Sequence, residues 1–316
     1  MGRWHAYYAA RRGTVAAVVD PDPERAATLA RRHRGAALFS SLDRCLGQGS
    51  VDAVHLCTPS ETHAESATVA LDAGKHVLIE KPVALSARSA EALVETAKRS
   101  GVVLTPAHQF PFQRGFARLV GGAESLGRPV EATFTIRTAG GDGLTEDARA
   151  CLLVEILPHP LSVFAAVFGL KVLKADWRVL HANADELEMR CEHAGAALRI
   201  DLSLRARPTC NQLSFSADAG SATVDFYHGF SSIQTGSPTR WDKAARPFRT
   251  SLSQIAAAGS NLALRALKRQ PAYPGLDELI AAFYRAVAGE AEPPIAPEET
   301  IAISRLLEAV TRNRQS

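Results

Sequence analysis

Short apolar runs alternate with helix-forming segments through the first hundred residues. The runs that read as buried strands are 14–19, 36–39, 51–57, 76–79 and 102–104. The segments between them that have a helical pattern are 23–30, 41–46, 63–73 and 86–99. Strands separated by helices predict right-handed βαβ crossovers, so we expect a doubly wound parallel sheet covered on both faces.

The pattern changes near residue 107, where we expect a second domain to begin. The strands expected there span 131–137, 172–180, 186–193, 197–204, 212–217 and 222–227. The helices expected there span 112–120, 152–169, 251–268, 276–288 and 297–312. Short turns between consecutive strands predict an open, mostly antiparallel sheet. The chain therefore divides into an α/β domain over residues 1–106 and an α+β domain over residues 107–316, whose last helices pack back.

Composition excludes several classes of protein. The 316 residues include 36 basic and 33 acidic side chains without a basic block, which argues against a nucleic-acid partner. No apolar run reaches the length of about 18 residues that spans a membrane, and the first residues lack the apolar core of a secretion signal. The five cysteines are widely spaced and form no Cys-x-x-Cys pair, so we expect free, buried thiols in the cytoplasm and no metal site.

Polar residues follow three of the expected parallel strands. They are Asp20, the Thr58-Pro59-Ser60 turn and the Glu80-Lys81-Pro82 turn. Ligands of parallel sheets bind at the carboxyl ends of the strands, so these residues stand where a site is expected. A carboxylate at Asp20 can accept hydrogen bonds from ribose hydroxyls and repels a 2′-phosphate, which favours NAD over NADP. The alternative for Asp20 is an ordinary turn-starting aspartate before a proline.

Several segments together resemble the Gfo/Idh/MocA oxidoreductase family, the relatives of glucose–fructose oxidoreductase and inositol dehydrogenase. The segments that carry the resemblance are Gly2–Ala6, Asp20–Ala26, Thr58–His63, Ala73–Pro82, Gly289–Pro294, and Glu155 followed by His159. Each is weak alone, but the ordered set covers nearly the whole chain and the Gly-Lys-His-Val-x-x-Glu-Lys-Pro segment is highly specific. The resemblance implies a Rossmann-like N-terminal domain, an NAD cofactor and hydride-transfer chemistry.

One part of the family pattern is missing. Such proteins open with a strand followed by Gly-x-Gly-x-x-Gly, and here only Gly2 matches, at the last glycine. We therefore expect a parallel sheet without its first, central strand. Two explanations stay open: a native start upstream of Met1, or a true truncation that weakens or abolishes cofactor binding.

The resemblance assigns most of the candidate site residues. Those it implies for the cofactor are Gly2, Arg3, Trp4, Asp20, Thr58, Pro59, Ser60, His63, Glu80 and Lys81. For His63, which begins the next expected helix, the alternative is a packing or capping residue. Glu80 would lie near the nicotinamide ribose, and Lys81 would face both nicotinamide and substrate. An adjacent Glu-Lys pair on a surface is ordinarily uninformative, but here it follows a buried strand directly.

His159 is the candidate general base, because an imidazole titrates near neutrality and can take the proton of a carbinol. Glu155, four residues earlier, would orient it, in place of the aspartate of the family pattern. Pro158 and Pro160 put a shared helical face in doubt, because a helix starting near Pro158 would leave Glu155 in the preceding turn. A histidine in an apolar stretch is also more often a core residue. Gln109 and Arg114 are the other substrate-contact candidates.

These observations together predict a cytoplasmic NAD-dependent dehydrogenase or reductase. Its substrate would be a hydroxyl or keto group of a sugar, cyclitol or similar metabolite. The chain would form a dimer or tetramer through the second domain's sheet. Two alternatives remain: a non-catalytic NAD- or ligand-binding regulatory paralogue, or a glycosidase that uses NAD for transient oxidation.

Overall fold

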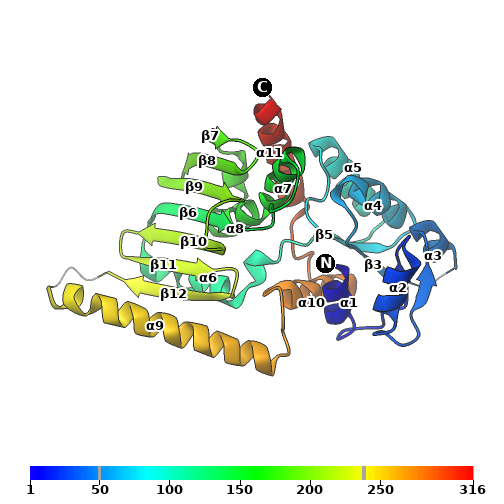
Figure 1. The fold of residues 1–316 in the computed structure, drawn as a ribbon, viewed down its shortest axis with the longest axis horizontal. Helices are drawn as coiled ribbons and strands as arrows, with labels where there is room; N and C mark the ends of the chain where they lie inside the picture. The colour runs from blue at the N-terminus through cyan, green and yellow to red at the C-terminus, as the bar shows by residue number, and fades with distance from the viewer. Residues whose placement is uncertain (49–50, 237–239, 316) are drawn as a thin grey trace. The chain divides into compact units, whose positions relative to one another are not determined.

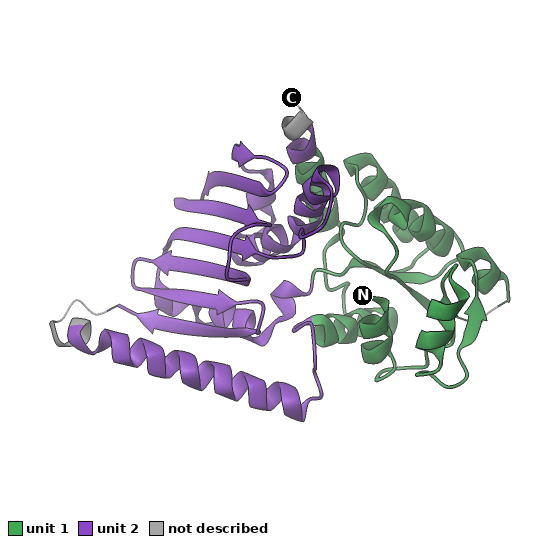
Figure 2. Ribbon diagram, viewed as in Figure 1, with its two compact units in different colours: residues 1–108, 276–308 green, residues 109–275, 309–316 purple. Residues whose placement is uncertain are grey.

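The computed structural model describes residues 1–48, 51–236 and 240–315, which form two compact units. Unit 1 comprises residues 1–108 and 276–308, and unit 2 comprises residues 109–275 and 309–316 (Figure 2).

Unit 1 is built from short parallel strands and the helices that connect them (Figure 1). Its first helices and strands are α1 (Gly2–Ala9), β1 (Ala17–Val19), α2 (Pro23–Ala30), β2 (Ala37–Phe39), α3 (Leu42–Gln48), β3 (Ala53–Leu56), α4 (His63–Asp72), β4 (His76–Ile79), α5 (Ala87–Arg99) and β5 (Leu104–Pro106). A single-turn helix, η1 (Ser60–Thr62), precedes α4. The helix α10 (Leu276–Val287) and the first part of α11 (Pro297–Gln315) also belong to this unit.

The predicted Rossmann-like parallel architecture is confirmed. β1 pairs with β2, and β3, β4 and β5 form a second sheet; every pair is parallel. Within the described residues, the two sheets remain separate. Val77, Leu78 and Ile79 of β4 are fully buried, which is the near-continuous apolar pattern of a strand covered on both faces.

The last strand of unit 1 begins later than its sequence suggests. Residues 102–104 are the expected strand, but β5 starts at Leu104. Gly101 adopts a positive φ of 65°, and the Val102 N–H bonds to the Ala97 carbonyl 3.0 Å away. This backbone cap closes α5 and uses the N–H of Val102, so the strand ladder begins further along.

Helix α10 belongs to the core of unit 1 although it lies near the end of the chain. Leu276, Ile280 and Phe283 pack with Tyr8 of α1 and Leu78 of β4 in one buried apolar cluster. The ion pairs from Arg11 and Arg12 to Asp277 join the turn that follows α1 to α10. Helix α10 thus holds α1 against the three-stranded sheet.

Unit 2 consists of one large sheet with helices against it (Figure 1). Its elements are η2 (Phe110–Phe112), α6 (Arg114–Leu126), β6 (Pro129–Arg137), α7 (Glu146–Ile156), α8 (Pro158–Phe168), η3 (Leu170–Lys174), β7 (Arg178–Ala182), β8 (Glu186–His193), β9 (Ala196–Ser203), β10 (Cys210–Ala217), β11 (Gly220–Asp225), β12 (Phe230–Thr235) and α9 (Arg240–Leu267). The strand order is β12-β11-β10-β6-β9-β8-β7.

The predicted mostly antiparallel sheet is confirmed, with one parallel pair. β6 and β9 run parallel, because the chain between them contains α7 and α8 and returns through a long crossover. Along β9, alternate residues from Ala196 to Leu202 are buried, so one face of the sheet carries the core.

Two strand predictions in unit 2 are wrong. Residues 172–174 form the short helix η3 instead of strand, because Val172 and Leu173 are both buried and the Trp177 indole N–H donates to the Val172 carbonyl. β12 was not predicted at all, because two serines stand where an alternating pattern of apolar and polar residues would be needed to indicate a strand. Ser231 and Ser232 are nevertheless buried within it.

Within the described residues, one helical stretch, Glu146–Phe168, passes a length and hydropathy test for a membrane span. Its 23 residues are long and apolar enough to cross a membrane by length and composition alone, with a mean hydropathy of 1.8 over the best window. Half of that window is buried inside the protein, and Leu161, Val163 and Phe164 are fully buried. A core helix passes the same test, so this is weak support for a membrane span.

Two glycines of α6 allow a test of the packing between α6 and β12. A Cβ built on Gly115 would lie 2.5 Å from the Phe230 backbone, whereas one on Gly121 would meet nothing within 4 Å. We expect Gly115→Ala to lower the free energy of unfolding by about 2 kcal/mol or more, and Gly121→Ala to raise it by about 0.5–1 kcal/mol. Urea unfolding of both variants measures this. Equal effects from the two variants would contradict the close approach.

Candidate functional site

The turns that follow β3 and β4 form one polar edge of unit 1. Leu56 and Ile79 are register partners at the ends of these parallel strands, so the turns after them lie side by side. The first turn carries Thr58, Pro59 and Ser60, and the second carries Glu80 and Lys81. The structure therefore brings these sequence-predicted residues together at the carboxyl edge of the three-stranded sheet.

His63 ties the two turns to each other. Its Nδ1 lies 2.7 Å from the Pro82 carbonyl oxygen, and its Nε2 lies 2.9 Å from the Thr58 carbonyl oxygen. The side chain is almost fully buried. His63 was predicted to bind the cofactor; in the structure both of its ring nitrogens contact the backbone of the turns.

A second histidine, His5 of α1, contacts the same edge of the sheet. Its Nε2 lies 2.9 Å from Oε1 of Glu80, and both side chains are buried. The Glu80 N–H donates to the Leu56 carbonyl, so backbone and side chain both fix this residue. This contact joins residues 75 positions apart in the sequence and ties the Glu80 side chain to α1. Lys81, the next residue along the chain, is therefore held close to α1 through its neighbour.

The electrostatics of this pair favour its charged form. Burial alone would lower the pKa of His5, but Cys57 and Glu80 overcome this and raise it to about 10. Burial alone would raise the pKa of Glu80, but the hydrogen bond and charge of His5, together with the neighbouring Lys81, hold it below its ordinary value. The pair is therefore an imidazolium and a carboxylate at neutral pH.

His55 of β3 and Tyr284 of α10 extend the pair into a hydrogen-bonded chain. The Nδ1 atoms of His5 and His55 are 3.1 Å apart, and Nε2 of His55 lies 3.1 Å from the Tyr284 hydroxyl oxygen. Burial and the charge of His5 lower the pKa of His55 well below its ordinary value, so His55 is neutral. His5 then donates to His55, and His55 donates to Tyr284.

The remaining cofactor candidates lie at α1 and at the end of β1. Gly2 begins α1, and a Cβ there would lie an ordinary 3.8 Å from Cβ of Cys57, at the end of β3. The Arg3 guanidinium carbon lies 4.9 Å from the centre of the Trp4 ring. Asp20 ends β1 and accepts a hydrogen bond from the Asp22 N–H at 2.9 Å through one carboxylate oxygen, as a turn-starting aspartate does.

In unit 2, His159 lies in an aromatic stack. Its ring is parallel to that of Phe110, with centroids 4.2 Å apart and an angle of 11° between the planes. Phe110 also stacks on Phe226, at 4.9 Å. Gln109, a substrate-contact candidate, directly precedes Phe110, and exposed Arg114 begins α6. The stack fixes the plane of the imidazole.

Glu155 and His159 lie on two helices that share a joint at Leu157. The predicted interruption at Pro158 is present, because α8 begins there, but Glu155 lies within α7 and not in a turn. Leu157 keeps a right-handed helical backbone (φ −57°, ψ −29°) between the two helices. Ser162, where many family members carry aspartate, donates its hydroxyl hydrogen to the His159 carbonyl at 2.9 Å.

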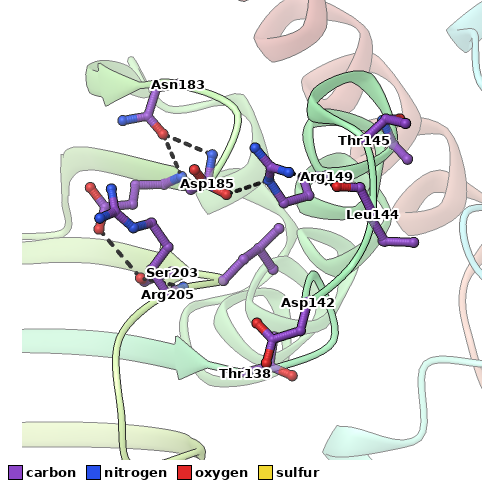
Figure 3. Close-up of polar contacts among 12 residues, drawn as sticks. Thr138, Asp142, Leu144, Thr145, Arg149, Asn183, Asp185, Ser203 and Arg205 are labelled. Carbon is purple, nitrogen blue, oxygen red and sulfur yellow. Dashed lines mark hydrogen bonds and ion pairs between the residues drawn. The ribbon is translucent and has the colours of Figure 1, made fainter.

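A polar network anchors the loop that leads into α7 (Figure 3). The Arg149 guanidinium donates to Asp185 at 2.6 Å and to the Leu144 carbonyl at 2.7 Å. Arg207 makes two contacts of 3.1 Å with Asp142 in the same loop. These bonds hold the start of the helix pair that carries Glu155 and His159.

Four residues of these clusters had no predicted role: His5, His55, Tyr284 and Phe110. Their only sequence signal is a polar or aromatic side chain inside an apolar segment. Among the described residues, no group of three or more His, Cys, Asp and Glu side chains is arranged to hold a metal ion. The five cysteines are free thiols, but the prediction that they are buried is correct only for Cys45 and Cys191; Cys151 is exposed.

The buried pair predicts a pH-dependent contribution to stability. The pKa of His5 is raised from 6.5 to about 10, so its contribution is complete below pH 6.5 and is lost as the pH rises toward 10. The pKa of Glu80 is lowered from 4.5, so its contribution to stability is complete at pH values above 4.5. We expect His5→Gln to cost about 3 kcal/mol at pH 6, and most of this difference to disappear by pH 10. Urea unfolding at pH 6, 8 and 10 measures it.

The control for this experiment is His181→Gln, which changes an exposed histidine of β7. It should shift the free energy of unfolding by no more than about 0.5 kcal/mol at any of these pH values. A His5→Gln penalty that stays constant from pH 6 to pH 10 would show that His5 carries no charge in the folded protein.

Comparison with known proteins agrees with this architecture. Residues 1–108 match the GFO_IDH_MocA family model, described as an oxidoreductase family with an NAD-binding Rossmann fold. A UDP-N-acetylglucosamine 3-dehydrogenase of Acidithiobacillus ferrooxidans is 41% identical over 124 residues, which cover 37% of this chain and 39% of that protein. The match thus spans about two fifths of this relative's length.

Two further proteins match more of the chain. A 4-carboxy-2-hydroxymuconate-6-semialdehyde dehydrogenase of Sphingobium is 34% identical over 226 residues, covering 67% of this chain and 68% of the relative. The crystal structure of the WlbA dehydrogenase from Bordetella pertussis, in complex with NADH and UDP-GlcNAcA, superposes with a TM-score of 0.77 at 19% identity, covering 99% of this chain and 91% of that one. The first match shows common descent and the second shows a common fold: the chain belongs to the Gfo/Idh/MocA family of oxidoreductases.

Proposed function

We propose that this protein is an NAD-dependent dehydrogenase or reductase. It would move a hydride between nicotinamide and a hydroxyl or keto carbon of a sugar, cyclitol or similar metabolite. The observation that carries the proposal is the fixed turn at Lys81, which the buried His5–Glu80 pair and the two contacts of His63 hold at the carboxyl edge of a parallel sheet.

The residues of unit 1 fit a dinucleotide. The first N–H groups of α1 have no partner within the helix and can face a phosphate. Thr58 and Pro59 are exposed on the turn beside Lys81, and Asp20 offers a carboxylate for ribose hydroxyls. NAD, when bound, supplies the hydride acceptor or donor. A carboxylate at Asp20 repels a 2′-phosphate, so NAD is preferred over NADP.

The protein's own groups would handle the proton. When a carbinol is oxidised, a hydride leaves its carbon and a proton leaves its oxygen. A ring nitrogen of His159 takes that proton, with the imidazole plane set by the Phe110 stack and Glu155 as its orienting carboxylate. The Lys81 ammonium holds the substrate oxygen and can relay the same proton. Gln109 and Arg114 contact the substrate.

The names of relatives add one class of substrate to be tested. UDP-N-acetylglucosamine and UDP-GlcNAcA appear in the names of two similar proteins, so nucleotide-linked sugars join the sugars and cyclitols to be tested. Unit 1 would carry the cofactor and unit 2 the substrate. Cysteines without disulfides support a cytoplasmic enzyme. We place subunit contacts on the large sheet of unit 2.

The test is NADH formation across a panel of sugars, cyclitols and nucleotide sugars, run in parallel with NADP. We expect turnover with NAD, and a loss of kcat/KM of about 100-fold or more in Lys81→Ala and in His159→Asn, because each removes a group that handles the proton. Lys75→Ala is the matched control, since Lys75 lies at the opposite end of β4.

Two results would contradict the proposal. The first is NADH binding, measured by fluorescence, without turnover on any substrate of the panel; this would indicate a regulatory paralogue. The second is full activity in Lys81→Ala or His159→Asn, which would remove that residue from the chemistry.

A further inference from the structure

Helix α9 lies along β12, the edge strand of the unit 2 sheet (Figure 1). Small and polar side chains face that strand. Oγ of Ser253 lies 3.1 Å from Oγ of Ser232, and the Asn261 side-chain amide donates to the His228 carbonyl at 2.8 Å. The helix is thus attached to its own unit largely through polar contacts.

The large apolar side chains of α9 point the other way. Phe248, Leu252, Ile255 and Leu262 are 74%, 66%, 69% and 69% exposed. A surface helix ordinarily buries its apolar face and exposes its polar one, so the polarity of α9 is reversed. Contiguous apolar surface of this kind marks an interaction site.

The apolar positions follow the spacing of a helix-pairing seam. Together with Gly259 and Ala266, the four large side chains occupy positions separated by four, three, four, three and four residues. This is the a/d pattern of a coiled coil, in which side chains of one helix fill holes on a second helix. We call these six positions the α9 seam.

The seam is symmetric about residue 257. In an antiparallel pair centred there, Phe248 meets Ala266, and Leu252 meets Leu262. Ile255 meets Gly259, where an added Cβ would find nothing within 4 Å, so there is room for a large side chain. Two of the three kinds of contact therefore join a large residue to a small one, which is the self-complementarity that a two-fold interface requires.

We propose that the α9 seam joins two copies of this chain, with their α9 helices antiparallel about a two-fold axis at Ala257. Residues 244–267 of α9 carry three arginines and no acidic residue, which would also suit an anionic membrane surface. Binding to a membrane would not require large side chains to lie opposite small ones symmetrically about residue 257, whereas pairing with a second copy does.

The size of the seam sets the strength of the contact. In a pair centred on residue 257, residues 247–267 of the two α9 helices overlap, which is a length of about 32 Å on a helix about 10–12 Å wide. Pairing these segments buries on the order of 1,000 Å² or less over both copies, which is at the lower bound of a specific interface. The contact should therefore dissociate on dilution.

Sedimentation velocity of the full chain from about 1 to 100 μM tests the proposal. We expect at least a dimer of the 33.8 kDa chain at the upper concentration. Ile255→Glu places a charge in the seam and should halve the assembled mass, weakening association by about 100-fold or more. Gln254→Glu adds the same charge on a different face of α9 and should leave the mass unchanged. Far-ultraviolet circular dichroism confirms that each variant is folded.

The orientation is tested by a charge pair. Leu252→Glu alone should halve the assembled mass, and Leu252→Glu combined with Leu262→Lys should restore it, because these positions face each other only in the antiparallel arrangement. A double variant that stays dissociated overturns that arrangement. A monomeric parent chain, a mass unaffected by Ile255→Glu, or a seam-dependent sedimentation with anionic vesicles in place of self-association overturns the proposal as a whole.

Discussion

The contact on which the candidate site depends is the buried pair between His5 and Glu80. Removing two charges from water is costly, and the cost is offset only when each charge is hydrogen-bonded in good geometry. Here one ring nitrogen of His5 donates to the Glu80 carboxylate and the other donates to the neutral imidazole of His55, so both N–H groups of the imidazolium have a partner. Glu80 directly precedes Lys81 in the sequence. The position of α1, which carries His5, therefore determines the position of Lys81.

This arrangement explains why unit 1 needs its distant C-terminal helix. Tyr284 of α10 ends the hydrogen-bonded chain that starts at Glu80, and Asp277 of the same helix pairs with two arginines near the end of α1. Helix α10 therefore supports α1 at two points. One is His5, through the hydrogen bonds of His55 and Tyr284, and the other is the turn after α1, through the ion pairs to Asp277. The packing of α10 is therefore physically linked to the arrangement of Glu80 and Lys81 at the carboxyl edge of the three-stranded sheet.

Much of the fold could be predicted from local pattern, because short apolar strands and helical segments alternate clearly up to residue 107. The strand β12 could not, since Ser231 and Ser232 are polar but buried. The first part of α9 was missed because Pro247 lies inside the helix. Lys81 and His159 are proposed from family spacing, whereas His5 and Phe110 make contacts between distant segments, which no spacing reveals.

The most direct test of this account is the protonation state of His5 in the folded protein, measured by ¹⁵N and ¹³C nuclear magnetic resonance of labelled histidine side chains. The His5→Gln and His55→Gln variants assign the two signals. At pH 8 we expect the His5 ring to be doubly protonated and the His55 ring to be neutral. A neutral His5 ring at that pH would contradict the charged pair and, with it, the proposed anchoring of Lys81.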